Sequence, residues 1–395
     1  MVNINKNNIL FLFHSSNLNN GATRSMIDVI ENLIKRPNVK IVVLYPDKKG
    51  TAIKYLNDLG VKTYKIYYGR WDYYPAQKFI KKMFFFIKSF LKQLFGILNI
   101  PIIIKIIRKE KIDLVYTNTS VIYEGALLSK LTKIKHIWHI REFGREDHGF
   151  EIIYGKKIFM KFLNKNTDAV IFISDSIRQK FISMINNTNT YVIYNDISKK
   201  FINRKKQQET GKKLKMAIIG TIQEGKGQYE VIKAVKILRN RNLDIELHIA
   251  GEETGEYYKK LKDYVKKNNL EKYVLFDGFI RNVNEYRQQM DIGIVASSNE
   301  AFGRVTIEGM LSQMLMIGAN CGGTKELIKD NFNGILYELH NENDLAEKIE
   351  RFYDDRFALN EIANNGFNYA VKEFTEGKAA EKIYAIMQLL IDGGK

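Results

Sequence analysis

The stretch ASSNEAFGRVTIEGMLSQMLMIGANCGGTKELI, residues 296–328, decides the fold of the second half of the chain. The run DIGIVAS, which begins at Asp291, has the composition of a buried strand. The run from Arg304 to Gln313 has the apolar spacing of a helix, whose inward positions are Val305, Ile307, Met310 and Leu311. Glu300 is therefore predicted on the loop that leaves a strand, and Glu308 inside the following helix. Ligands of open α/β sheets bind at this end of the strands.

The side chains of this stretch suit a ligand that carries both hydroxyl groups and phosphates. A carboxylate accepts the paired hydroxyls of a ribose or a hexose. Backbone N–H groups at a helix start bind anions, and here they belong to Gly303, Arg304 and Val305, while a second anion-binding turn is formed by Gly322, Gly323 and Thr324. The alternative is that two glutamates eight residues apart are unrelated surface groups.

A strand, loop and helix unit opens the same half of the chain. KMAIIG, from Lys215 to Gly220, is predicted as a strand, TIQEGKG as a glycine-bearing loop, and QYEVIKAVKILRN as an amphipathic helix. Lys226 on the loop would place its charge on a diphosphate, which is both the anchor and the leaving group of an activated sugar. The alternative is an ordinary solvated lysine.

The order of these segments resembles the carboxyl-terminal domain of the retaining family 4 glycosyltransferases of the GT-B fold, as found in bacterial surface-polysaccharide synthesis. The matching motifs are GTIQEGKG at 220–227, HIAGEE at 248–253, FDGFI at 276–280, EAFGRVTIE at 300–308 and GGTKE at 322–326. One position departs from the family, because Thr221 stands where an arginine usually contacts the donor diphosphate. Either Lys226 makes that contact alone or Arg304 or Arg24 replaces the arginine.

The resemblance also implies roles for single residues. Glu308 would hold the nucleotide ribose, Lys226 the diphosphate and Glu300 the donor sugar. The backbone around Phe302 and Gly303 would line the sugar pocket, and the turn from Gly322 to Thr324 would support that loop.

The first half repeats the strand, loop and helix pattern. NNILFLFHSS is predicted as a strand, NLNNGATR as a loop and SMIDVIENLIK as a helix. Asn20 and Gly21 occupy the turn in which the family usually has a Gly-Gly pair under the donor phosphates.

The run IKHIWHIREFGREDHG contains three of the six histidines of the chain. His139 ends a predicted strand, and alternation places it on the same face as Ile137. In the family, a histidine at this position contacts the donor sugar and the reacting centre. The alternatives are a structural histidine or a metal site, although the spacing matches no compact metal signature, and that site would use His136, His139, Glu142 and His148.

Two residue sets follow from these arguments, and no metal is expected in either. The predicted catalytic residues are His139, Glu300 and Lys226. The predicted donor-binding residues are Gly21, Thr221, Lys226, Phe302, Gly303, Arg304, Val305, Glu308, Gly322, Gly323 and Thr324.

The length of 395 residues predicts two domains. Strands and helices alternate throughout, which predicts an α/β protein with two Rossmann-like, doubly wound domains facing each other across a cleft. The predicted bounds are 1–200 and 215–378, with a basic linker at 201–214 and a helix at about 379–391 that crosses back to the first domain. The single cysteine, Cys321, and the absence of a long apolar leader predict a cytoplasmic protein, and the basic segment described next would place it peripherally at the inner face of the membrane.

Positive charge is concentrated in the first half of the chain. Residues 1–200 contain 33 Lys and Arg against 15 Asp and Glu, whereas residues 201–395 contain 29 of each kind. Residues 77–111 alone carry nine basic residues and one acidic residue among Phe, Leu and Ile. This segment is predicted to lie on an anionic membrane surface without crossing it. The alternative is two ordinary helices, separated near Pro101, with Phe84, Phe85 and Ile87 in the core.

These observations predict a hexosyltransferase that moves a sugar from a UDP- or GDP-sugar to a saccharide acceptor, which we expect to be lipid-linked, without a metal or other cofactor. A sugar-nucleotide epimerase of the same fold and a catalytically idle, donor-binding subunit are the alternatives. A nucleic-acid binder is disfavoured, because no recognition motif accompanies the basic half.

Overall fold

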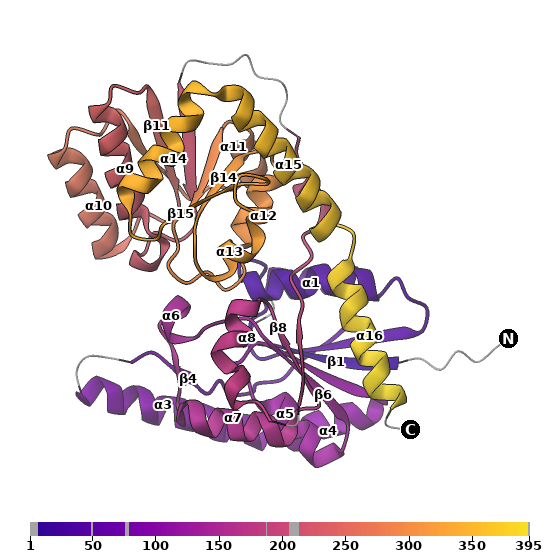
Figure 1. Cartoon of the computed structure of the whole chain (residues 1–395). Coiled ribbons are helices and arrows are strands. Elements are labelled where there is room, and N and C mark those ends of the chain that lie inside the picture. The colour runs from indigo at the N-terminus through magenta and orange to yellow at the C-terminus, as the bar shows by residue number, and fades with distance from the viewer. Residues whose placement is uncertain (1–6, 49, 76–78, 187, 205–212, 394–395) are drawn as a thin grey trace. The chain divides into compact units, whose positions relative to one another are not determined.

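The computed structural model describes residues 7–48, 50–75, 79–186, 188–204 and 213–393, apart from the side chains of 79–82 (Figure 1). The chain forms two compact units, Met1–Asp196 with Gly377–Lys395, and Ile197–Glu376. The boundary at Asp196 lies four residues before the predicted one at 200. Of the predicted linker, residues 205–212 lie outside the described residues, and Leu214 already begins a strand.

The first unit is built on a parallel sheet with the order β3-β2-β1-β5-β6-β8-β9. Its strands are β1 (Asn7–Phe13), β2 (Val39–Tyr45), β3 (Lys62–Lys65), β5 (Leu114–Asn118), β6 (Lys135–Ile140), β8 (Ala169–Phe172) and β9 (Asn189–Val192). A short antiparallel pair joins β4 (Asp72–Tyr73) to β7 (Glu151–Ile152). The helices are α1 (Gly21–Leu33), α2 (Thr51–Asp58), α3 (Phe79–Leu98), α4 (Ile100–Lys109), α5 (Glu124–Thr132), α6 (Arg145–His148), α7 (Gly155–Asn166), α8 (Asp175–Phe181) and α16 (Lys378–Asp392).

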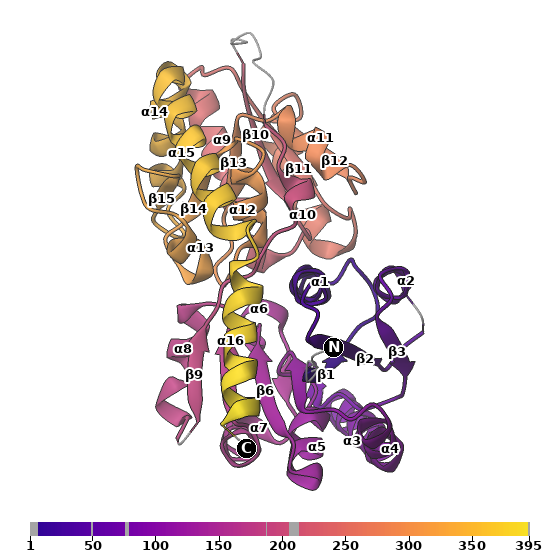
Figure 2. The same ribbon diagram turned by 90° about the vertical axis from the view of Figure 1, so that its right-hand side faces the viewer.

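Both faces of this sheet are covered, as its uniformly apolar strands require. Along β1, Ile9, Phe11 and Phe13 face the core formed with α1, α2 and α16, while Leu10 and Leu12 face the core formed with α4 and α5. Figures 1 and 2 show α1 and α16 on one side of the sheet and α4 and α5 on the other.

The carboxyl-terminal helix α16 begins on a buried side chain of the first unit. The two carboxylate oxygens of Asp196 accept hydrogen bonds from the backbone N–H groups of Ala379 and Ala380 at 3.1 and 3.0 Å. A carboxylate at this position satisfies unpaired donors of the first helical turn. Asp196 thereby fixes the point at which the chain rejoins the first unit, and α16 then packs through Ile383 and Met387.

The second unit contains a parallel sheet with the order β12-β11-β10-β13-β14-β15. Its strands are β10 (Leu214–Ile219), β11 (Ile245–Ala250), β12 (Val274–Gly278), β13 (Ile292–Val295), β14 (Leu315–Ala319) and β15 (Ile335–Tyr337). Its helices are α9 (Gln228–Asn240), α10 (Gly255–Lys267), α11 (Val283–Gln288), α12 (Arg304–Met310), α13 (Gly322–Leu327), α14 (Glu342–Asp354) and α15 (Arg356–Phe374).

Each sheet has a position at which the strand order reverses. In the first unit it lies between β1 and β5, and in the second between β10 and β13. In doubly wound folds the loops at the carboxyl ends of these strands diverge and leave room for a ligand. The two candidate sites are therefore expected at these two points.

Glu124 is a buried carboxyl group in the first unit, and it predicts an unusual pH dependence of stability. Burial raises the pKa of Glu124 from 4.5 to about 8. Because the folded-state pKa exceeds the unfolded one, this contribution to stability is fully present below pH 4.5 and is lost as pH rises towards 8. The wild type should lose a few kcal/mol of its free energy of unfolding as pH rises from 4.5 towards 8, and we expect Glu124→Gln to lack this loss. Urea unfolding of both proteins at pH 5 and pH 8 tests this, and an equal pH response in the two would contradict it.

Candidate functional site

In the second unit, three loops meet at the carboxyl ends of β10, β13 and β14. The N–H of Ser298 donates to the carbonyl of Gly225 at 3.2 Å, which joins the first loop to the second. The N–H of Gly323 donates to the carbonyl of Glu300 at 2.7 Å, which joins the third loop to the second. The glycine-bearing loops noted in the sequence therefore form one hydrogen-bonded cluster at the strand-order reversal.

Lys226 and Glu300 come together in this cluster, although 74 residues separate them. Lys226 ends a short 3-10 turn before α9, and Glu300 lies on the loop after β13. Their charged atoms are 2.8 Å apart, and both side chains are partly exposed. A partly exposed pair can exchange its mutual contact for contacts to a ligand at small cost. The pair thus offers a cation for a phosphate and a carboxylate for hydroxyl groups.

Glu308 lies inside α12, as predicted, but its carboxylate is already engaged. Arg287 of α11 and Arg304, one turn away, each contact one of its oxygens. Burial alone would raise the pKa of Glu308, but the two arginines overcome burial and hold that pKa below its ordinary value. A hydroxyl ligand would have to share this carboxylate with two guanidinium groups, each oxygen keeping a second lone pair. Arg287 was missed in the sequence because it lies outside every recognised motif.

The other predicted donor-binding residues differ in how they are placed. Phe302 is buried, and its ring lies 6.1 Å from that of Phe374. Thr324 is fully buried, whereas Thr221 is exposed, and Val305, predicted to face inward, is only half-buried. The helix α12 ends at Met310, three residues before the predicted end, and Gln313 in the turn that follows has a positive φ of 58°.

The glycines of the loop cluster are required by close packing. Gly303 has a φ of +93°, and Gly322 has a φ of +53° with space for no side chain against the backbone of Glu300. Gly21 is different, since it begins α1 behind the N-cap Asn20 and a side chain there would meet no heavy atom within 4 Å. Helix α1 starts four residues before the predicted helix because Asn20 accepts a hydrogen bond from the N–H of Thr23.

Replacing Gly323 by alanine should therefore lower the stability of the protein, whereas replacing Gly21 by alanine should leave the stability unchanged. In Gly323→Ala the new Cβ would lie 2.6 Å from the carbonyl oxygen of Phe302. Such overpacking costs about 1–3 kcal/mol, which lowers the melting temperature by several degrees. Gly21→Ala should melt like the wild type, so that any functional defect would come from hindered ligand approach. A large loss of stability in Gly21→Ala would contradict this prediction.

In the first unit, His139 lies at the carboxyl end of β6 and is buried. Its Nδ1 is 2.6 Å from the hydroxyl of Tyr116 and 3.1 Å from Nη2 of Arg141. A guanidinium can only donate, so Nδ1 accepts and the proton of the neutral ring lies on Nε2. This Nε2 is buried and has no hydrogen-bond partner among the residues that the structure describes.

The electrostatic surroundings keep His139 neutral. Burial, and then the positive charge of Arg141, hold the pKa of His139 well below its ordinary range. The ring therefore acts as a hydrogen-bond donor through Nε2 and is neither a cation nor a base at that atom. The sequence predicted only that His139 is catalytic, whereas the structure indicates that its neutral ring would act by donating a hydrogen bond from Nε2.

Arg141 and Asn118 organise this edge of the sheet. Asn118, the last residue of β5, accepts a hydrogen bond from Arg141 and donates to the carbonyl of Ala22 at 3.1 Å. Arg141 also donates to the side chain of Asn195 at 2.6 Å. The start of α1 and the His139 ring are therefore held by one buried network. Its asparagines have no motif around them, and only their position at strand ends could have indicated them.

Two further features at the same edge are typical of functional sites. His14 follows β1, and its Nδ1 is buried without a hydrogen-bond partner among the described residues. Burial lowers the pKa of His14 to about 3, and the positive charges of nearby arginines contribute to the same shift. Thr119, just after β5, has a φ of +127°, which is strained for a β-branched residue. Such strain gathers at functional sites because the surrounding fold must hold it in place.

The residues of the alternative metal site do not form one group. His136 lies within hydrogen-bond distance of the hydroxyls of Thr117 at 2.8 Å and Thr167 at 3.2 Å, both within the first unit's interior. Glu142 accepts from the N–H of Ser120 at 3.0 Å. Among the described residues, no group of three or more His, Cys, Asp or Glu side chains is arranged to hold a metal ion.

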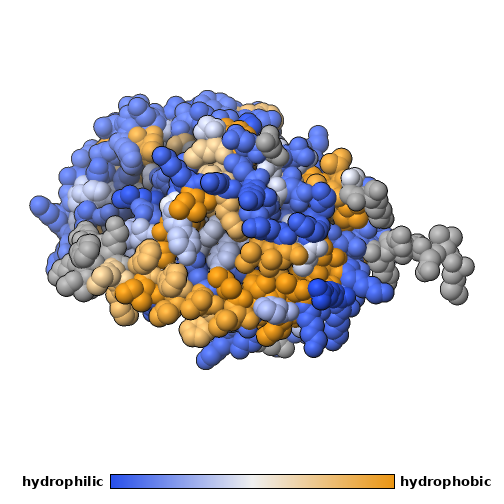
Figure 3. Space-filling model, turned by 90° about the horizontal axis from the view of Figure 1, so that it is seen from below, coloured by the Kyte–Doolittle hydropathy of each residue, from blue (hydrophilic) through white to orange (hydrophobic). Residues whose placement is uncertain are grey.

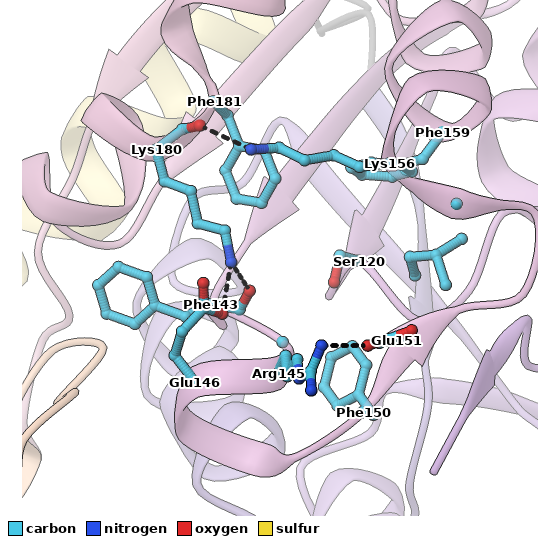
Figure 4. A pocket seen from close by; sticks show the side chains of 13 residues that line it. Ser120, Phe143, Arg145, Glu146, Phe150, Glu151, Lys156, Phe159, Lys180 and Phe181 are labelled. Atoms are coloured by element: carbon cyan, nitrogen blue, oxygen red, sulfur yellow. Dashed lines mark hydrogen bonds and ion pairs between the residues drawn. The ribbon is translucent and has the colours of Figure 1, made fainter. Parts of the chain in front are cut away.

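A pocket of about 340 Å³ opens beside this edge, between α6, β7, α7 and α8 (Figure 4). Aromatic rings and three cationic side chains line it, the cations being Arg145, Lys156 and Lys180. Arg145 pairs with Glu151, and Lys180 pairs with Glu146. Lys156 donates to the carbonyl of Lys180 at 3.2 Å and forms no ion pair among the described residues. Aromatic faces with a spare cation suit a sugar that carries a phosphate.

Comparison with known families matches both units. The model described as "Glycosyltransferase Family 4" matches residues 19–199, and the one described as "Glycosyl transferases group 1" matches residues 199–369. An uncharacterised glycosyltransferase of Methanocaldococcus jannaschii is 28% identical over 299 residues, which is 73% of this chain and 78% of that protein.

Two further similarities are to a curated protein and to a solved structure. The N-acetylgalactosamine-N,N'-diacetylbacillosaminyl-diphospho-undecaprenol 4-alpha-N-acetylgalactosaminyltransferase of Campylobacter jejuni is 28% identical over 191 residues, covering 48% of this chain and 51% of that protein. The crystal structure of Anabaena HepE in complex with UDP and glucose superposes with a TM-score of 0.73 at 20% identity, covering 96% of this chain and 99% of the other.

Proposed function

Because the chain belongs to the family 4 glycosyltransferases, enzymes of the GT-B fold, we propose that it moves a hexose from a nucleoside diphosphate to a lipid-linked saccharide with retention of anomeric configuration. The observation that carries this proposal is the Lys226–Glu300 pair at the strand-order reversal of the second unit. The epimerase and the idle subunit are less well supported, since the relatives named above are glycosyltransferases.

The second unit is proposed to hold the donor. Lys226 and the backbone N–H groups at the start of α12 would contact the diphosphate, and Glu300 would accept hydrogen bonds from the sugar hydroxyls. The similarity to a structure that contains UDP supports a uridine nucleotide. Glu308 would share its remaining lone pairs with the ribose.

The reaction is proposed to proceed on one face of the sugar. The bond from the anomeric carbon to the diphosphate oxygen breaks, the acceptor oxygen bonds to that carbon, and the acceptor proton passes to the departing diphosphate. Lys226 would stabilise the negative charge that develops on the leaving group. The Nε2–H of His139, which lacks a partner among the described residues, would donate to an oxygen of the donor sugar.

The pocket of the first unit is proposed to bind the acceptor. Its phenylalanines offer flat apolar surfaces for a sugar ring, and Lys156 is a cation without an ion-pair partner among the described residues. A saccharide diphosphate would satisfy both features. The Campylobacter jejuni relative acts on a diphospho-undecaprenol saccharide, which supports this class of acceptor.

The proposal is tested in two steps. A panel of UDP- and GDP-sugars should contain at least one that raises the melting temperature, because a ligand bound only by the folded state stabilises it. That donor and a lipid-linked saccharide acceptor should then yield a product whose anomeric configuration, read by NMR, equals that of the donor. Stabilisation by none of the donors, or an inverted product, would contradict the proposal.

A further inference from the structure

Helix α3 buries its polar face and exposes its apolar face, which is the reverse of the usual arrangement at a water-facing surface. Its buried side chains include the polar residues Ser89 and Gln93, while nearly every apolar side chain between Met83 and Leu98 is exposed. Ser89, Gln93 and Gly96 follow the spacing of one helix face. A helix at the surface of a soluble protein normally buries its apolar face and exposes its polar one. The sequence left open whether Phe84, Phe85 and Ile87 lie in the core, and all three are exposed.

The inverted orientation is fixed by close backbone contact. A Cβ on Gly96 would lie 2.4 Å from the N of Gly69, and one on Gly69 would lie 2.7 Å from Cα of Gln93. The Ser89 hydroxyl lies 3.4 Å from the carbonyl of Arg70. Because only glycines permit this approach, α3 cannot rotate to bury its apolar side without losing the contact.

The outer side of α3 and the start of α4 form one continuous apolar band, seen in orange in Figure 3. Phe84 is 62% exposed and Leu98 is 65% exposed. The other exposed members are Met83, Phe85, Phe86, Ile87, Phe90, Leu91, Leu94, Phe95, Ile97 and Ile102. Contiguous apolar surface of this kind marks an interaction site. We call it the α3 band.

The α3 band is bordered by positive charge. Lys88 and Lys92 are one helical turn apart and exposed, and Lys105, Arg108 and Lys109 are exposed on α4. The sequence from 79 to 109 contains no Asp or Glu. A second copy of this chain would bring the same cations against these, whereas an anionic lipid surface complements both the charge and the apolar side chains.

Length and composition alone would allow the segment Met83–Lys109 to cross a membrane, and 33% of an 18-residue apolar stretch within it is buried. The buried part decides against crossing. Ile103 and Ile107 of α4 belong to the core beneath the sheet together with Leu128 of α5. Crossing would pull these side chains out of the core and break the Gly69–Gly96 contact. The segment is therefore placed to lie along a membrane.

We propose that the α3 band is a docking surface for an anionic bilayer, with α3 parallel to the membrane and its phenylalanines inserted among the lipid chains. The antiparallel pair of β4 and β7 connects the docked helix to the acceptor pocket, since Ser89 contacts the carbonyl of Asp72 and Glu151 lines the pocket. Docking would thus bring this pocket to the lipid surface. The docking itself stands independently of the proposed reaction.

The test measures binding of the full chain to vesicles of phosphatidylcholine with and without phosphatidylglycerol. The wild type should sediment with the anionic vesicles. Lys88→Glu/Lys92→Glu should bind these vesicles at least about tenfold more weakly. Phe84→Ser/Phe95→Ser/Leu98→Ser should lose binding by a larger factor, because insertion of apolar side chains contributes most of the affinity. All replaced side chains are exposed, so circular dichroism should show an unchanged fold.

A matched control is available in the second unit. Lys262 and Lys266 on α10 are exposed and have the same spacing as Lys88 and Lys92. Lys262→Glu/Lys266→Glu should bind vesicles like the wild type. Equal binding by all variants would overturn the proposal. A wild-type dimer that dissociates in the serine variants would also overturn the proposal, because it would identify a second copy as the occupant. Resistance of the membrane-bound protein to carbonate extraction would overturn it as well, because it would indicate that the helix spans the membrane.

Discussion

Lys226→Ala and Glu300→Gln should each lower kcat/KM for sugar transfer by about 10²- to 10³-fold, which is the loss seen when one group that stabilises developing charge is removed. Lys226→Ala removes the cation that is proposed to stabilise the departing diphosphate. Glu300→Gln keeps the shape of the side chain but loses the charge that is proposed to bind the sugar hydroxyls. Initial rates at varied donor concentration check both. Because their ion pair is partly exposed, neither change should lower the melting temperature by more than a few degrees.

The second unit contains a matched control for this pair. Lys233 and Glu342 form an ion pair at 2.9 Å, and the two lysines are equally exposed. Lys233→Ala therefore removes an equivalent contact from the same unit without touching the loop cluster. It should keep near-wild-type transfer. Similar activity in Lys226→Ala and Lys233→Ala would show that the loop cluster is not the donor site.

Local sequence was enough to predict the loop cluster of the second unit. The strands β10 and β13 are short apolar runs, and the glycines and charged residues that follow them are close in sequence to those strands. Parallel pairing then brings Lys226 and Glu300 to the same edge of the sheet. Arg287 could not be predicted in this way, because its partnership with Glu308 depends on how α11 packs against α12.

The first unit was less predictable, since its network is assembled from separate strand ends. Arg141, Asn118 and Asn195 lie on different segments, and each is an unremarkable polar residue in the sequence. The orientation of α3 was also hidden, because a periodic pattern shows which residues share a face but not which face is buried. Gly69, on another segment, fixes that orientation, because its lack of a side chain lets the backbone of α3 approach closely.

His139→Leu should lower kcat by about 10²-fold, because it removes the buried Nε2–H that is proposed to donate to the donor sugar. His139→Gln should recover part of this loss, since an amide can accept from Arg141 and still offer an N–H. The pH profile separates this role from that of a general base. The lowered pKa keeps the His139 ring uncharged around pH 7. If the wild-type kcat changes near pH 6.5, the same change should therefore persist in His139→Gln.

His136 provides the comparison for His139 on the same strand. It is equally buried, and burial also lowers its pKa, to about 3. Both of its ring nitrogens have hydroxyl partners, so it has no N–H left for a ligand. His136→Gln is therefore expected to lower the melting temperature while the folded fraction keeps its kcat. Equal loss of kcat at both positions, or a titration near pH 6.5 that belongs to His139, would be incompatible with a neutral donor at this atom.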